Sequence, residues 1–315
     1  MRIIIIYQIP KNEVLKIKLG QLLYLVKYYT YTKVTNKKRP ILAGVKLTHR
    51  CTLKCRQCPF WRRPGEDIKF TQLKETMKNL YEQGVRIWLM EGGEPLLWRD
   101  GELNIHDIVA EAKKYFYCVG VTTNGTLPID VKTDVVWVSV DGLRDTHNYL
   151  RSNSFDKVIE NIKKSRHPKL FSNIVINRLN YQEIPELVKF LSDIVKGITI
   201  QFFFPYPESE DLALTWEQRE KVLDELIELK KEGWPLVDSF TALKALKKNT
   251  WKCEPWMVVC VERDGTVEQG CYLKNRTPYE DPCKICGLTA HTELSLAYQL
   301  NWEAINVGRK TMGIF

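Results

Sequence analysis

The sequence predicts an α/β fold built on a parallel sheet. From residue 41 onward, short runs rich in β-branched and aromatic residues alternate with stretches of helical periodicity. The chain has 315 residues, 44% of them hydrophobic, which suffices for one large core. Parallel neighbours require crossover connections, and the helical stretches supply them. We expect six strands, near residues 41–47, 86–90, 117–122, 135–140, 172–177 and 197–203.

The helices that connect these strands are expected from spacing and from start signals. Pro185 stands at a first helical turn and Thr215 at a capping position. The connection from 123 to 134 is too short for a good helix, so one crossover should lack one. No internal repeat is evident. We expect helices near 71–83, 105–115, 154–165, 184–194 and 215–231.

Positive charge is concentrated at the N-terminus. Residues 1–50 hold eleven Lys or Arg against one acid, although the whole chain carries a net charge of only +9. From Lys11 to about Tyr31 the spacing predicts a basic amphipathic helix with an aromatic flank. Its apolar face could lie in an anionic membrane surface, or could pack on the body of the protein with the lysines solvated. Nucleic acid is not expected as a partner, because no recognised binding motif accompanies the charge. The apolar positions are Val14, Leu15, Leu19, Leu22, Leu23 and Val26.

The chain is expected to act in a reducing compartment. Nine cysteines are too sparse for a disulfide scaffold, and their clustering favours metal ligation. The apolar runs, such as 3–6 and 22–26, are far too short to span a membrane, and no cleavable signal peptide is evident. We therefore expect a cytoplasmic protein, peripheral on the inner membrane face if the N-terminal helix binds lipid.

Three cysteines, Cys51, Cys55 and Cys58, lie in eight residues directly after the first expected strand. Soft thiolate ligands select iron–sulfur clusters, zinc or copper(I). A [4Fe–4S] cluster held by three cysteines leaves one iron able to bind a small molecule, whereas structural zinc normally has four protein ligands. A cluster is favoured; a zinc knuckle and three buried thiols are the alternatives.

Further candidates follow the next three strands, at the edge where parallel sheets place their chemistry. Glycines let a backbone approach a ligand closely, a carboxylate complements a positive amine, and hydroxyl or amide groups can bind polar atoms. A tight turn is the alternative for the glycine string after the second strand, and an ordinary turn is the alternative for Asn124-Gly125. The candidates are Gly92, Gly93 and Glu94 after the second strand, Thr123 and Asn124 after the third, and Ser139 and Asp141 after the fourth.

The cysteine triplet and these strand ends together resemble the radical S-adenosylmethionine (SAM) superfamily, over roughly residues 41–290. The resemblance implies a partial (β/α)6 barrel, a [4Fe–4S] cluster on the CxxxCxxC motif and SAM bound to its open iron. It also implies reductive cleavage of SAM to a 5′-deoxyadenosyl radical that abstracts hydrogen from an unactivated carbon, with an electron donor such as ferredoxin or flavodoxin.

The same resemblance assigns the remaining SAM contacts. Gly92, Gly93 and Glu94 would hold the ammonium group, and Arg151 would pair with the carboxylate, a geometry that a guanidinium suits. A surface ion pair is the alternative for Arg151. Asn177 is a candidate for the adenosine. The aromatic residue that often precedes the third cysteine is Gln57 here, so Phe60 or Trp61 is expected to substitute.

The tail has cysteines of its own. Asp264-Gly265 is a strong turn signal, which predicts a hairpin of 257–262 with 266–269. The flanking cysteines resemble the small auxiliary-cluster extension of the Twitch type, without the full seven-cysteine SPASM pattern. That resemblance implies a second [4Fe–4S] cluster, and a structural zinc stays open. Cys118 and Cys260 are left over as buried thiols. The expected ligands are Cys253, Cys271, Cys283 and Cys286.

The substrate is inferred from a looser likeness, to the branch that holds adenosyl hopene transferase and archaeal tetraether-lipid synthases. It implies modification or C–C coupling of an isoprenoid membrane lipid, with a peptide or protein substrate as the alternative. A binding module that only recruits partners is disfavoured, since it leaves the strand-end motifs unexplained. We expect a basic segment at 1–40, the barrel at 41–235 and the auxiliary-cluster extension at 236–315.

Overall fold

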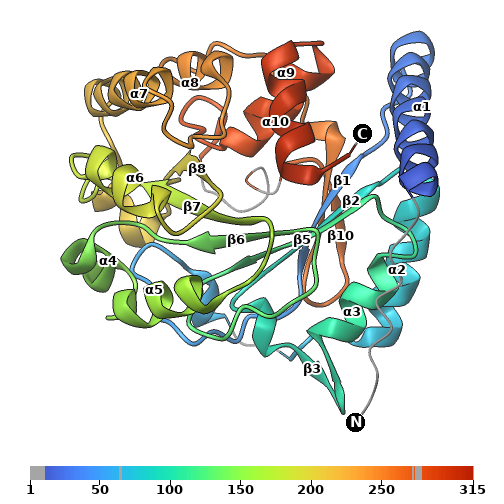
Figure 1. Cartoon of the computed structure of the whole chain (residues 1–315), viewed down its shortest axis with the longest axis horizontal. Coiled ribbons are helices and arrows are strands. Elements are labelled where there is room, and N and C mark those ends of the chain that lie inside the picture. Colours follow the sequence, from blue (N-terminus) through green and yellow to red (C-terminus); the bar gives the residue numbers. More distant parts are fainter. Residues whose placement is uncertain (1–10, 64–65, 272, 274–278, 315) are drawn as a thin grey trace.

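The protein is organised around one eight-stranded sheet in the order β10-β9-β1-β2-β5-β6-β7-β8 (Figure 1). The structure, a computed structural model, describes residues 11–63, 66–271, 273 and 279–314, and the side chains of residues 11–17 lie outside that description. The six strands from β1 to β8 in this order pair in parallel, which confirms the six predicted strands. They are β1 (Leu42–Lys46), β2 (Ile87–Glu91), β5 (Cys118–Thr123), β6 (Val135–Ser139), β7 (Leu170–Ile176) and β8 (Gly197–Phe202).

The predicted crossover helices form where the periodicity placed them. They are α2 (Phe70–Gln83), α3 (Ile105–Ala112), α5 (Phe155–Lys164), α6 (Ile184–Ser192) and α7 (Trp216–Lys231). Thr215 caps α7 in a reciprocal arrangement with Gln218, because each side chain accepts from the other residue's backbone N–H. The crossover from β5 to β6 contains no helix, as expected.

Several elements were not predicted. The short strands β3 (Arg99–Asp100) and β4 (Leu103–Asn104) form a separate hairpin, and 3-10 turns occupy η1 (Phe60–Arg62), η2 (Pro95–Leu97), η3 (Pro207–Leu212) and η4 (Pro255–Met257). Helices α7 to α10 contact one another in sequence along one side of the molecule (Figure 1). The unpredicted helices are α4 (Arg144–Leu150), α8 (Phe240–Leu246), α9 (Thr289–Tyr298) and α10 (Trp302–Met312).

Alternation along the strands gives the sheet two buried faces. In β1, Ala43 and Val45 join the main core, which includes Leu73 and Met77 of α2. The opposite face carries a smaller apolar cluster that includes Cys118 and Trp137, and Ile314 beyond α10 packs into it. The barrel interior is therefore closed with apolar side chains at the N-terminal ends of the strands. Cys118 and Cys260 are both buried, as predicted.

The predicted N-terminal helix is present as α1 (Lys11–Thr35), and it packs on the body through its tyrosines and through Leu25, which is not among the predicted apolar positions. Tyr24 donates to the carbonyl of Gly84 at 2.7 Å, and Tyr298 donates to Thr32 at 3.1 Å. The idea that the aliphatic face packs on the body is thus wrong for the described side chains. The predicted apolar positions whose side chains are described all stay exposed: Leu19 (55%), Leu22 (41%), Leu23 (61%) and Val26 (56%). The other two, Val14 and Leu15, lie outside the described side chains. Within the described ranges, no helix is both long and apolar enough to cross a bilayer.

The tail continues the sheet. β9 (Val258–Val261) pairs in parallel with β1, and β10 (Val267–Gln269) returns antiparallel to β9, which confirms the predicted hairpin. Further on, the carbonyl of Gly287 accepts a hydrogen bond from the N–H of Phe202 at the end of β8, at 2.9 Å. The tail therefore contacts both edge strands of the parallel sheet, β1 through β9 and β8 through Gly287.

Candidate active site

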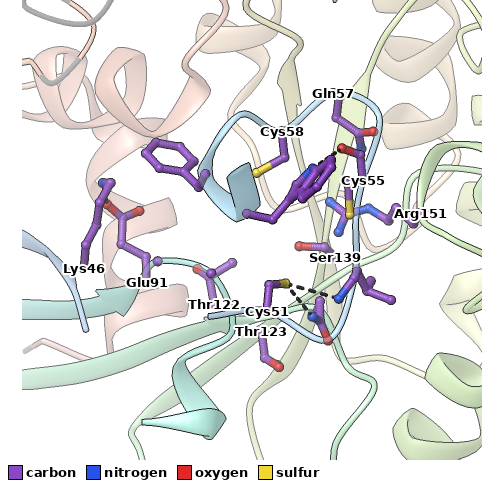
Figure 2. A pocket seen from close by; sticks show the side chains of 16 residues that line it. Lys46, Cys51, Cys55, Gln57, Cys58, Glu91, Thr122, Thr123, Ser139 and Arg151 are labelled. Atoms are coloured by element: carbon purple, nitrogen blue, oxygen red, sulfur yellow. Dashed lines mark hydrogen bonds and ion pairs between the residues drawn. The ribbon is translucent and has the colours of Figure 1, made fainter. Parts of the chain in front are cut away.

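A cavity of about 200 Å³ opens at the C-terminal ends of β1, β2, β5 and β6. Figure 2 shows Cys51 and Cys58 in its middle, with Lys46 and Glu91 at one end and Gln57 and Arg151 at the other. Most of the predicted site residues therefore meet in one place. Those that line the cavity are Cys51, Cys55, Cys58, Phe60, Gly92, Gly93, Thr123, Asn124, Ser139 and Arg151.

The loop that carries the three thiols is fixed by backbone hydrogen bonds. The N–H of Arg56 donates to the carbonyl of Leu150 at 2.9 Å, and Trp61 Nε1 donates to the carbonyl of Cys55 at 3.0 Å. Burial raises the pKa of Cys55 to about 12 and also raises the pKa of Cys51. These thiols need a bound cation to be held as thiolates at neutral pH.

Two glycines bring the end of β2 against this loop. A Cβ on Gly93 would lie 2.3 Å from the carbonyl oxygen of Arg50 and 2.6 Å from that of His49. Gly92 has a φ of +135°, and a Cβ there would lie 2.5 Å from the carbonyl of Thr48. Only glycine permits this close approach, which explains why the motif stands directly beside the cysteine loop.

Glu94 was predicted to bind an amine, but the structure places it behind the cavity wall. Its side chain is fully buried and does not line the cavity. The carboxylate accepts hydrogen bonds from Thr123 Oγ1 and the Asn124 N–H, both at 2.7 Å. Desolvation raises the pKa of Glu94, and these donors oppose the rise. In this arrangement Glu94 orders the strand end that carries Thr123 and Asn124.

Asp141 and Arg151 were predicted as separate ligand contacts, and they form a buried ion pair. Arg151 Nε lies 2.5 Å from Asp141 Oδ2, and Gln57 Nε2 donates to the same oxygen at 2.7 Å. The side chain of Asp141 has no exposed surface and that of Arg151 only 11%, so the surface ion pair considered for Arg151 is excluded. Asp141 thus lies outside the cavity lining and aligns two residues that are part of it.

Asn177 also lies away from the cavity. It is fully buried, and its Oδ1 accepts from the N–H of Leu179 at 2.9 Å, in the turn after β7. Phe60 does line the cavity, with its ring centre 5.3 Å from Lys46 Nζ, and Trp61 lies beside it in the lining.

The sequence interpretation missed one pair in the cavity. Lys46 ends β1 and Glu91 ends β2, and Lys46 Nζ lies 2.6 Å from Glu91 Oε1. The Lys46 side chain is only 4% exposed, although lysine is rarely buried unless paired. A lysine inside an otherwise apolar strand was the available signal. Thr122 and Leu53 line the cavity as well.

Comparison with known proteins assigns the residues around this cavity to a protein family. Residues 45–191, which supply the lining, match the family described as the radical SAM superfamily. The chain carries a radical SAM domain. Residues 198–311 match a second family, described as a domain of unknown function (DUF3463).

The curated proteins that the chain is similar to include two biosynthetic proteins. The pre-heme d1 synthase of Dinoroseobacter shibae is 28% identical over 163 residues, which cover 47% of this chain and 39% of that protein. The antilisterial bacteriocin subtilosin biosynthesis protein AlbA of Bacillus subtilis is 27% identical over 171 residues, 49% of this chain and 37% of AlbA. The match therefore spans less than half of each relative's own length.

A solved structure resembles most of the chain. SuiB of Streptococcus suis, bound to S-adenosylmethionine, gives a TM-score of 0.64 at 14% identity and covers 90% of this chain and 69% of SuiB. SuiB bound to its precursor peptide SuiA gives 0.62. This likeness shows a shared fold, the partial barrel of radical SAM enzymes.

A radical SAM domain implies a [4Fe–4S] cluster and SAM as cofactors, and the residues present fit both. Three soft ligands, Cys51, Cys55 and Cys58, line one cavity. Gly92, Gly93 and the guanidinium of Arg151 line the same cavity. In the described part of the chain, no group of three or more His, Cys, Asp or Glu side chains is arranged to hold a single metal ion.

The tail cysteines lie near one another, beyond β8. Cys271 and Cys286 pack in one apolar cluster with Phe204. Burial raises the pKa of Cys253 to about 11 and that of Cys271 to about 12, and the nearby Cys286 thiol contributes to both shifts. Such a set is consistent with an auxiliary cluster. Cys283 is the most exposed of the four.

Proposed function

We propose that this protein is a radical SAM enzyme that removes a hydrogen atom from an unactivated carbon of its substrate. The observation that supports this most directly is the position of the three CxxxCxxC thiols, which share one cavity with Gly92, Gly93 and Arg151. When bound, the cluster and SAM supply the electron and the 5′-deoxyadenosyl radical that this chemistry requires.

The residues of the chain would bind the cluster, orient SAM and enclose the cavity. Cys51, Cys55 and Cys58 hold the cluster, and the two glycines allow the backbone to approach SAM. The Asp141 carboxylate holds Arg151 at one end of the cavity, where the guanidinium can pair with a carboxylate of SAM. Phe60 and Trp61 add aromatic surface to the cavity lining, which would help to limit the access of water to a reactive radical.

The test is SAM cleavage by anaerobically reconstituted, reduced protein. We expect 5′-deoxyadenosine from the wild type and none from Cys55→Ala. The matched control is Cys118→Ala, which also removes a buried thiol, but one that contacts Met312 and is not part of the cavity lining. Unchanged turnover in Cys55→Ala would remove the proposal.

We propose that the substrate is a membrane lipid and that α1 places the enzyme on the bilayer surface. Leu19, Leu22, Leu23 and Val26 recur at the i, i+3, i+4 and i+7 positions, so they form one exposed stripe. Lys18 and Lys27 are exposed nearby, and the sequence has no acid between residues 13 and 66. An aliphatic stripe among uncompensated cations suits an anionic lipid surface. The isoprenoid nature of the lipid rests on the family likeness alone.

Vesicle flotation tests this placement. Binding should rise with anionic lipid content, fall with ionic strength and weaken strongly when Leu19, Leu22 and Leu23 are changed to serine. The control is Leu179→Ser, since Leu179 is also exposed, at 38%, but lies between β7 and α6. If the wild type ignores anionic vesicles at low salt, the lipid proposal fails.

A peptide is the second candidate substrate. It is favoured by the likeness to SuiB, which has been solved with its precursor peptide, and by the match to AlbA, a bacteriocin biosynthesis protein. The observation that distinguishes the two is activity on detergent-free peptide in the absence of any membrane.

A further inference from the structure

Arg219 is a buried cation for which the described chain provides no anion. It lies in α7 and is only 5% exposed. Its guanidinium lies over the rings of Phe202, at 4.4 Å, and Trp216, at 5.0 Å. One side-chain hydrogen bond is made, from Nη2 to Asn249 Oδ1 at 2.8 Å, while Nε is buried without a partner. Among the described residues no carboxylate is within ion-pair distance.

This arrangement is costly unless a negative charge completes it. A buried charge without a counter-ion is disfavoured by several kcal/mol, and the aromatic contacts return only about 2 kcal/mol. Burial lowers the pKa of Arg219 to about 10, and the one group that opposes this shift is the thiol of Cys286. The thiol of Cys286, one of the tail cysteines, is therefore close enough to Arg219 to interact with it.

The connection to those cysteines is also made through hydrogen bonds. Asn249, which accepts from Arg219, donates through Nδ2 to the carbonyls of Cys283 at 3.2 Å and Lys284 at 3.0 Å. Arg219 is thus linked by a single side chain to the turn that carries two expected ligands. The Trp251 side chain, whose Nε1 is buried, lies toward the thiol of Cys253, another of the expected ligands.

We propose that Arg219 is the charge partner of a metal–thiolate centre on Cys253, Cys271, Cys283 and Cys286. The negative charge of four thiolates exceeds the positive charge of a divalent metal ion or of a cluster core. Such a centre therefore carries net negative charge whether it holds an iron–sulfur cluster or zinc. Its formation would supply the anion that the buried guanidinium lacks. The proposal rests on the auxiliary metal centre that the tail cysteines are expected to hold, and it is independent of SAM cleavage. For a cluster, a nearby cation also favours the reduced form.

A thermodynamic cycle tests the pairing without measuring activity. The thermal unfolding of wild type and Arg219→Met is compared in protein with the tail metal and in a Cys283→Ser, Cys286→Ser background without it. We expect the substitution to lower the unfolding temperature of the metal-loaded protein and to leave unchanged or raise that of the metal-free background. Arg219→Lys, which keeps the charge, should be milder in the loaded protein.

The control for this cycle is Arg86→Met. Arg86 is buried to a similar degree and also lies over aromatic rings, but it donates to the carbonyls of Tyr81 and Val85, away from the tail. Its loss should cost the same with and without the tail metal. If Arg219→Met behaves in this way too, or if elemental analysis finds no metal on the tail, the pairing is refuted.

A redox titration followed by electron paramagnetic resonance gives a second readout where the tail holds a cluster. Arg219→Met should move the midpoint potential of the tail cluster in the negative direction by about 59 mV or more, the one-electron equivalent of a tenfold change in equilibrium. The potential of the CxxxCxxC cluster should not move. An unshifted tail potential would contradict the proposal, and loss of SAM cleavage with an intact shift would count only against the proposed function.

Discussion

Removing the charge of Asp141 should reveal how strongly the buried ion pair holds the site. Besides Arg151 and Gln57, Asp141 accepts from the N–H of Val175 through Oδ1 at 2.8 Å. Asp141→Asn keeps the shape and the Val175 hydrogen bond but leaves Arg151 buried without a counter-ion. Breaking a buried pair on one side costs about 3–5 kcal/mol. We expect a loss of that size in the free energy of unfolding of the metal-free protein, measured in urea.

Two comparisons make this prediction specific. Asp156→Asn breaks the ion pair with Arg144, whose side chains are 58% and 68% exposed, and should cost about 0–1 kcal/mol. The double variant Asp141→Asn, Arg151→Met removes both buried charges and should recover part of the stability, although its SAM affinity should stay low. The reasoning is refuted if Asp141→Asn costs less than about 1 kcal/mol or if the double variant is less stable than the single one.

Three further outcomes are expected. Iron analysis should give about eight atoms per chain if the tail holds a [4Fe–4S] cluster, and about four beside one zinc if it does not; replacing Cys283 and Cys286 should remove only the tail metal. Gly93→Ala should abolish SAM cleavage because the added Cβ would meet a backbone carbonyl at 2.3 Å, and an active variant would contradict the tight turn. Burial raises the pKa of Asp238 to about 8 and of Glu293 to about 7, so the folded protein keeps protons that the unfolded chain has lost above about pH 5. The unfolding temperature should therefore fall from pH 5.5 to pH 8.5, and Asp238→Asn should flatten this dependence.

The parallel strands and their crossover helices could be predicted because their signals are local. In β6, residues 135–138 are all apolar, as expected for a strand buried on both faces. Helix α9 escaped prediction because polar residues occupy its buried face. Glu293 in that helix accepts from the N–H and the hydroxyl of Ser239, at 2.6 and 3.0 Å, and only the folded chain shows this partner.

The site was predicted in part for the same reason. The three cysteines and the two glycines stand in short contiguous motifs, so they could be found before any fold was known. The pairings of Lys46 with Glu91 and of Asp141 with Arg151 join different elements, and nothing in a local pattern says which acid meets which base. The face of α1 that packs on the body could not be predicted for a related reason. Arg86 lies over the ring of Tyr24, at 4.2 Å, and so favours the tyrosine side of the helix over its aliphatic side.

The attachment of the tail to both edges of the sheet has a consequence for biosynthesis. Val45 of β1 pairs with Val261 of β9, so almost the whole chain must leave the ribosome before the first strand acquires its outer neighbour. Until then the outer edge of β1 offers unpaired backbone groups on an apolar strand, a surface on which nascent chains can associate. Contacts this distant in sequence also form slowly. The yield of native protein should thus depend on how long the edge of β1 stays unpaired before β9 is added. Slower expression at lower temperature should increase this yield.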